Sequence, residues 1–176
     1  MKKNQKGFSL IELLIVVAII LIIAAIAIPN LLRSKIAANE SSAVGSVRTI
    51  GTAEVTYQSS WGSGYSIDLQ SLGGASPCIA ATAAAACLID PLLSQAPFTK
   101  SGYQFNAAGT LLVNGVYNGF EINAWPTTFQ TTGVRAFCDD HTGVLKFNVN
   151  GAAIGIAAGS CQAVATAPGV SGPVGN

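Results

Sequence analysis

The sequence predicts an α+β protein with a long, kinked N-terminal helix whose C-terminal half packs on a small antiparallel β-sheet. Two observations support this prediction. The chain begins with an apolar run that is followed by apolar residues at helical spacing. Later in the chain, short stretches alternate apolar and polar residues and are separated by turn residues, which is typical of antiparallel strands.

The apolar run extends from Phe8 to Ile28, and Glu12 is its only charged residue. As a helix, a run of this length spans roughly 30 Å, which is the thickness of the hydrocarbon core of a bilayer. Three basic residues precede the run, Lys2, Lys3 and Lys6, and two follow it, Arg33 and Lys35. The larger N-terminal cluster is expected to stay in the cytoplasm. We therefore expect one membrane span, with the rest of the chain outside.

Three interpretations of this N-terminal segment compete. It resembles a secretory signal peptide cleaved near the small-x-small sequence at residues 25–27, which would release a soluble protein. It could also be an uncleaved signal anchor, or a short basic leader followed by an apolar segment that stays in the mature protein. Glu12 favours the last interpretation, because an intramembrane charge costs about 2.5–3.5 kcal/mol and usually has a function and a partner.

Glu12 also lies at an informative distance from a possible cleavage site. Cleavage between Gly7 and Phe8 would create an α-amino group four residues before Glu12. In a staggered array of such helices, the amine of one subunit could meet Glu12 of the next. We expect the acid to act in assembly, because a lone subunit would leave it unpaired in lipid.

The stretch KGFSLIELLIVVAII, which contains these residues, resembles the prepilin signature of type IV pilins and the related pseudopilins. The resemblance implies that a dedicated peptidase cuts after Gly7, that Phe8 is then N-methylated, and that Glu12 supports subunit docking. It also implies a leader at 1–7, a transmembrane and assembly half of the helix at 8–30, and a globular pilin domain at 31–176. The implied partners are further copies in a helical filament, the prepilin peptidase/methyltransferase, the inner membrane before assembly and the assembly machinery.

Pro29 ends the unbroken apolar run. A proline inside a helix removes a hydrogen bond and clashes with the preceding turn, so we expect a kink there; the alternative is that Pro29 begins a second helix. Beyond it, Gly45 and Gly51 each weaken a helix by about 1 kcal/mol relative to alanine, so the segment needs a packing partner, which we expect to be the sheet. The apolar residues that predict one helical face are Ile36, Ala43, Val47, Ile50 and Tyr57.

Four stretches predict strands: 102–107, 119–126, 134–139 and 143–149. The sequence DDHTG between the last two predicts a hairpin turn. The segments FEINAWP and GVRAFCDDHTGVLKF resemble the globular half of bacterial type IV pilin-like proteins. The tail APGVSGPVGN has little apolar content and is expected to be disordered or loosely docked.

Four cysteines lie on the predicted outside, where disulfides form and persist. Their even number, the lack of C-x-x-C spacing and the single histidine favour two disulfides over a zinc site. Three pairings are possible, and the simplest joins Cys78 to Cys87 and Cys138 to Cys161. The first bridge would prevent CIAATAAAAC from forming one helix, because the ends of such a helix lie about 13 Å apart whereas bridged Cα atoms lie within about 7 Å.

The sequence predicts neither an enzyme nor a cofactor or metal. His141 lies beside Asp139 and Asp140 in a predicted turn, where such residues are common, and calcium would need more clustered carboxylates than these two. The formal net charge is +1, and without Lys2, Lys3 and Lys6 it becomes −2, with six basic and eight acidic residues. Neither value suggests a nucleic-acid-binding protein.

These observations predict a structural subunit of a type IV pilus-like extracellular filament, used for adhesion, motility or DNA uptake. The globular domain is expected on the periplasmic or outer side of the membrane. Two alternatives belong to other classes. One is a pseudopilin of a type II secretion system, and the other is a membrane-anchored binding protein that shares only the leader.

Overall fold

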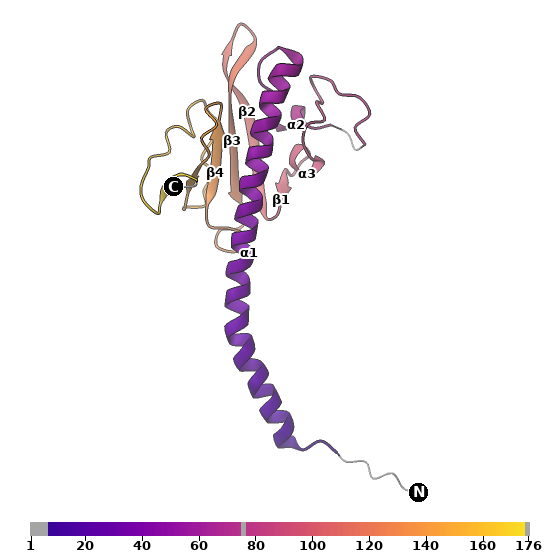
Figure 1. The fold of residues 1–176 in the computed structure, drawn as a ribbon, viewed down its shortest axis with the longest axis vertical. Helices are drawn as coiled ribbons and strands as arrows, with labels where there is room; N and C mark the ends of the chain where they lie inside the picture. Colours follow the sequence, from indigo (N-terminus) through magenta and orange to yellow (C-terminus); the bar gives the residue numbers. More distant parts are fainter. Residues whose placement is uncertain (1–6, 75–76, 175–176) are drawn as a thin grey trace. The chain divides into compact units, whose positions relative to one another are not determined.

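The computed structural model describes residues 7–74 and 77–174, so residues 1–6 of the predicted leader lie outside the described part. The helices are α1 (Leu10–Trp61), α2 (Leu69–Leu72) and α3 (Pro91–Ser94). The strands are β1 (Thr99–Lys100), β2 (Tyr103–Val113), β3 (Val116–Pro126), β4 (Ala136–Asp140), β5 (Lys146–Asn148) and β6 (Ser171–Pro173). The predicted α+β fold, a long N-terminal helix packed on an antiparallel sheet, is confirmed (Figure 1).

The chain divides into two compact units, Met1–Lys35 and Ile36–Asn176. The first contains the N-terminal part of α1, which continues through Pro29. The alternative in which Pro29 begins a second helix is therefore wrong, while a kink at this residue stays a prediction. Large apolar side chains of this part, from Phe8 to Leu32, are between 46% and 82% exposed.

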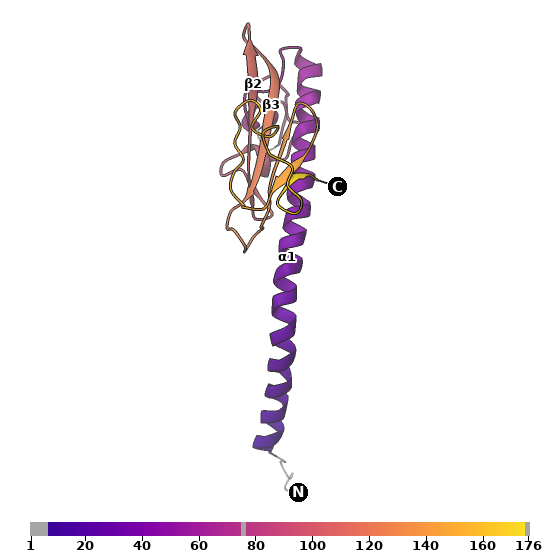
Figure 2. The same cartoon turned by 90° about the vertical axis from the view of Figure 1, so that its left-hand side faces the viewer.

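The second unit contains a sheet whose six strands follow the chain order β1-β2-β3-β4-β5-β6, each antiparallel to its neighbour. The C-terminal half of α1 runs along one face of β2, β3 and β4 (Figures 1 and 2). The short helices α2 and α3 belong to the connection between α1 and the sheet. Each starts at an aspartate N-cap, Asp68 or Asp90, whose carboxylate accepts a backbone N–H of the first turn.

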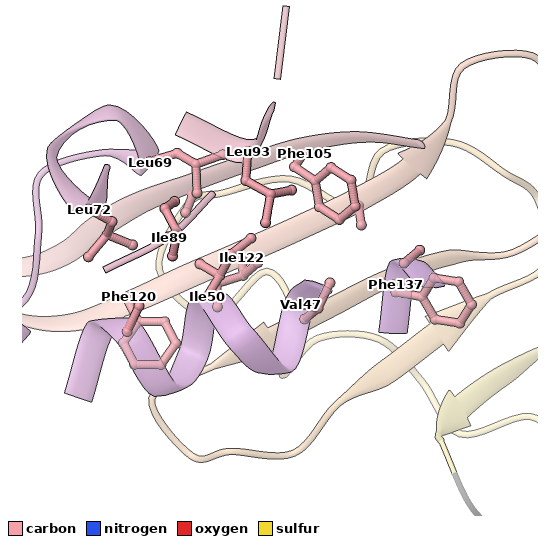
Figure 3. Packing of buried hydrophobic residues seen from close by; sticks show 14 of the residues in the cluster. Val47, Ile50, Leu69, Leu72, Ile89, Leu93, Phe105, Phe120, Ile122 and Phe137 are labelled. Carbon is pink, nitrogen blue, oxygen red and sulfur yellow. The ribbon is translucent and has the colours of Figure 1, made fainter. Parts of the chain in front are cut away.

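The core lies between α1 and this face of the sheet. The predicted helical face is confirmed from Ala43 onward, because Ala43, Val47, Ile50 and Tyr57 are buried, whereas Ile36 is only half-buried. From the sheet side, alternate residues of β3 point toward the helix, since side chains alternate between the faces of a strand. Figure 3 shows Val47 and Ile50 of α1 among side chains from the sheet and from the connection that contains α2 and α3; these are Leu69, Leu72, Ile89, Leu93, Phe105, Phe120, Ile122 and Phe137.

The hairpin of β2 and β3 is longer than predicted, because both strands extend beyond 102–107 and 119–126. Asn114 and Gly115 form its turn with φ angles of 52° and 80°, the left-handed pair of a type I′ turn. Gly109 interrupts the apolar pattern of β2 because the connection between α1 and α2 crosses the strand there. The N–H of Gly109 donates to the carbonyl of Ile67 at 3.1 Å.

The C-terminal tail is ordered as far as it is described, so the expectation of a disordered or loosely docked tail is wrong for residues 167–174. Ser171–Pro173 form β6, which pairs with β5, and the N–H of Val174 donates to the carbonyl of Leu145 at 2.8 Å. Pro173 lacks a backbone N–H, but it lies in the edge strand, where a missing donor does not interrupt the ladder.

Two disulfides are present, Cys78–Cys87 and Cys138–Cys161, with Cα–Cα distances of 6.1 and 5.6 Å. Between the first two cysteines, Thr82 and Ala85 exchange backbone hydrogen bonds of 3.0 Å. The alanine-rich stretch therefore folds back on itself and is not a helix, as expected for a bridged loop. The second disulfide is fully buried and ties the C-terminal segment to β4.

Two glycine-to-alanine substitutions should change stability in opposite directions. At neither Gly115 nor Gly45 would an added Cβ meet another atom within 4 Å, so only the backbone decides the outcome. Gly115→Ala should cost about 1–2 kcal/mol because of its left-handed conformation, whereas Gly45→Ala in α1 should stabilise by about 1 kcal/mol. Denaturant unfolding of both variants measures this, and stabilisation by Gly115→Ala would contradict the turn assignment.

Candidate processing and assembly site

The predicted cleavage site lies immediately before α1. The helix begins at Leu10, so the Gly7–Phe8 peptide bond is in a non-helical segment. Gly7 is exposed, and the Phe8 side chain is 82% exposed. The bond that a peptidase would cut is therefore accessible in the isolated chain and is not part of the helical hydrogen-bond ladder.

Glu12 has a partner within its own chain. The backbone N–H of Ser9 donates to Glu12 Oε2 at 2.8 Å. This is one of the two bonds of a capping box, in which the residue before the helix is Ser or Thr and the third helical residue is Glu or Gln. A carboxylate in the first turn also interacts favourably with the helix dipole. The Ser9 N–H gives Glu12 a hydrogen bond but no opposite charge, so the expectation that this charge is unpaired in a lone subunit stays a prediction.

The surface of α1 in this region is apolar. One face of the helix carries Leu10, Leu13, Leu14, Val17, Ala18 and Leu21, and Glu12 lies on the opposite side of the helix, because successive residues are rotated by about 100°. Among the described residues, α1 is the one helix that is long and apolar enough to cross a membrane. An apolar surface of this extent is typical of a segment that contacts lipid or other protein chains.

The remaining predicted site residues lie in the second unit. Asp140 accepts the N–H of Thr142 at 2.7 Å, and the N–H of Gly143 donates to the carbonyl of Asp140 at 2.8 Å, so the predicted β4–β5 turn is confirmed. His141 is exposed in this turn. In residues 7–74 and 77–174, no group of three or more His, Cys, Asp and Glu side chains could hold a metal ion.

Asp139 points from β4 toward α1, where Gly51 leaves room for its carboxylate. A Cβ atom at Gly51 would lie 3.3 Å from Asp139 Oδ2. Burial raises the pKa of Asp139 to about 6, against the lowering effect of the hydrogen bond from the Asp140 N–H and of the Arg48 charge. The helix-weakening Gly51 noted in the sequence thus has a packing reason.

Three buried glutamates were not singled out by sequence reasoning. Glu40 accepts the N–H groups of Val134 and Arg135 at 2.9 and 3.1 Å and pairs with the Arg135 guanidinium at 2.7 Å. Glu121 accepts the N–H groups of Gly159 and Cys161 at 2.7 and 3.1 Å. Glu54 accepts the N–H and hydroxyl of Ser66 at 2.9 and 2.7 Å. Each carboxylate attaches a loop to α1 or to the sheet, so these acids are structural.

Comparison with known proteins gives matches that cover part of the chain. Residues 2–28 match the family model described as the prokaryotic N-terminal methylation motif. The type IV wide pilus major component PilA4 of Thermus thermophilus is 62% identical over 39 residues, which cover 22% of this chain and 30% of that protein. The type IV major pilin protein PilA of Myxococcus xanthus is 46% identical over 54 residues, which cover 31% of this chain and 24% of that protein. No solved structure matches.

The chain thus combines the prokaryotic N-terminal methylation motif with an α+β fold that has a long N-terminal helix. The motif and both relatives support membership of the type IV pilin family. The aligned segments span less than a third of the length of either relative.

Proposed function

We propose that this protein is the structural subunit of a type IV pilus-like extracellular filament, assembled through the apolar half of α1. The observation that supports this most is the exposed apolar surface from Phe8 to Leu32. In water such a surface is unfavourable, and full burial of each large apolar side chain contributes about 1.5–3 kcal/mol. Before assembly, the lipid of the membrane keeps this surface away from water. In the filament, the helices of neighbouring subunits bury it.

The residues before and in the first turn of α1 have distinct proposed roles. The peptidase cuts after Gly7, and the new amino group of Phe8 is methylated. Glu12 Oε2 caps the chain's own helix through Ser9, whereas Oε1 has no hydrogen bond among the described residues. Oε1 is therefore the atom that we assign to the amine of a neighbouring subunit. This pair sets the register between helices, because a misaligned subunit leaves a charge unpaired.

The proposed function also assigns roles to the parts of the chain. Residues 1–7 are the leader, 8–30 the membrane and assembly segment with Pro29 as its kink, and 31–176 the globular domain. The precursor spans the inner membrane once with its globular domain outside. The mature subunit then lies in the filament, after contact with the peptidase/methyltransferase and the assembly machinery.

A deletion strain tests this function. Cells that lack the chain should lose a surface filament visible by electron microscopy, and expression of the wild-type chain should restore it. Filaments that persist at normal number, together with a processed chain found only in the inner membrane, would contradict the proposal. That result would favour a pseudopilin or a membrane-anchored binding protein.

A further inference from the structure

A cleft of about 410 Å³ lies between the C-terminal half of α1 and the β4–β5 turn. Apolar side chains and five polar or charged ones line it, among them Arg48, Val55, Phe120, Asp139, Asp140 and His141. All of these residues belong to the second unit. The volume is within the range of sites that hold a side chain or a small ligand.

The cleft has an excess of negative charge. Asp139 and Asp140 are 6% and 1% exposed, and Glu121 lies directly opposite Asp140 in the β3–β4 register. Arg48 is the only basic residue among the lining residues and forms no ion pair within the described part of the chain. Two carboxylates against one guanidinium leave one negative charge uncompensated at neutral pH.

One oxygen of this cluster is available to a partner. Asp139 Oδ1 accepts the N–H of Asp140 at 3.0 Å, but in residues 7–74 and 77–174 no hydrogen bond reaches Oδ2. Oδ2 lies beside Gly51 at the wall of the cleft. Oδ2 is not among the buried atoms that lack a hydrogen-bond partner, so it faces the solvent of the cleft, where a cation can reach it.

Two exposed basic side chains have a charge opposite to that of the cleft. Arg33 and Lys35 follow the apolar segment, are exposed, and form no ion pair among the described residues. Of the other exposed acids in the second unit, Asp90 pairs with Lys100 and Asp68 caps α2. The exposed charges of Arg33 and Lys35 are therefore available to a carboxylate of another copy when subunits pack together.

We propose that in the filament this cleft receives the basic pair Arg33 and Lys35 of a second copy of the chain. The inference rests on the proposed function, because only assembly brings many copies side by side. It adds an ionic contact between the segment after the membrane span of one subunit and the globular domain of another. His141 lies at the exposed rim of the cleft and is the residue at which the contact can be altered without changing the core.

Cysteine cross-linking in assembled filaments tests this contact. The variant K35C/H141C should form covalent dimers and higher multimers on mild oxidation, since the wild-type chain contributes no free cysteine. The matched control K35C/D68C places the second cysteine at an acid outside the cleft and should form few. Filaments in which both variants cross-link equally, or in which neither does, would overturn the proposal while leaving the filament function intact.

A charge exchange provides the second measurement. Lys35→Glu and His141→Lys should each lower the fraction of subunits that stay in pelletable filaments on heating by about twofold to fivefold, as expected for a partly exposed ion pair. The double variant should recover toward the wild-type fraction. If the two losses simply multiply, Lys35 does not meet this cleft and the proposal is wrong. If the wild-type chain forms no filament, the proposed function itself fails.

Discussion

Replacing Glu12 with alanine should abolish filament assembly and leave membrane insertion intact. The substitution removes the carboxylate that we assign to the amine of the neighbouring subunit, and breaking a buried charge pair costs about 3–5 kcal/mol. Insertion should continue because the remaining apolar run is uncharged. The measurement compares the amount of the chain in sheared filaments and in the inner-membrane fraction. Wild-type filament yield from this variant would contradict the assembly role of Glu12.

Glu12→Gln separates the charge from the cap. Glutamine retains an oxygen that can accept the Ser9 N–H, so the start of α1 should be preserved. It has no charge to offer an amine of another subunit. The account expects Glu12→Gln to fail in assembly as Glu12→Ala does. Normal assembly of the glutamine variant alone would mean that the capping bond, and not the charge, is what Glu12 provides.

Glu54→Gln should stabilise the globular domain at pH 8 by up to about 3 kcal/mol. Burial raises the pKa of Glu54 from 4.5 to about 7, with a smaller contribution from the Asp68 charge and against the hydrogen bonds from Ser66. The folded state therefore binds a proton more tightly than the unfolded state. In the wild-type protein, the contribution of this proton to the stability of the folded state is fully present below about pH 4.5 and is lost as the pH rises through about 7.

The geometry around Ser66 explains why glutamine is a suitable replacement. The Ser66 hydroxyl lies 2.7 Å from Glu54 Oε1 and 3.0 Å from the carbonyl of Asp68. A protonated glutamate or a glutamine can donate to this hydroxyl, which then donates to Asp68, while the other oxygen accepts the Ser66 N–H.

Denaturant unfolding of the full-length protein in detergent at pH 5 and pH 8 tests the prediction. Wild type should be less stable at pH 8, and the variant should lose less stability between the two values. The other carboxyl groups with raised pKa, Asp139 and Glu121, keep part of the dependence in both proteins. A variant that is less stable than wild type at pH 8 would show that the charge of Glu54 is needed.

The parts of the fold that were predicted correctly depend on local patterns. The face of α1 that contains Val47 and Ile50 repeats at helical spacing, and β3 and β4 alternate in polarity. The extension of β2 and β3 to their Asn114–Gly115 turn was missed because Gly109 resembles a loop residue in the sequence, although it marks the crossing of another segment. The tail was missed because β6 is held mainly by backbone pairing with β5, which needs no apolar side chains.

The residues of the candidate site and the buried acids also differ in whether a local sequence pattern reveals them. Roles for Gly7, Phe8 and Glu12 could be predicted because the motif is contiguous, and the spacing of Ser9 and Glu12 would also have predicted their capping box. Glu40 and Glu121 could not be found, because their partners lie far along the chain. Glu40 and Val134 are 94 residues apart, and Glu121 and Gly159 are 38 apart. Such pairs become visible only when the sheet has brought the segments together.

The central claim is that this chain is processed after Gly7 and becomes the main protein of a surface filament. The most direct test is the intact mass of the main protein in filaments sheared from the source cells. The account predicts the mass of Phe8–Asn176 plus one methyl group and minus four hydrogens for two disulfides. A mass that begins at Ile28, or absence of the chain from the sheared fraction, would contradict it.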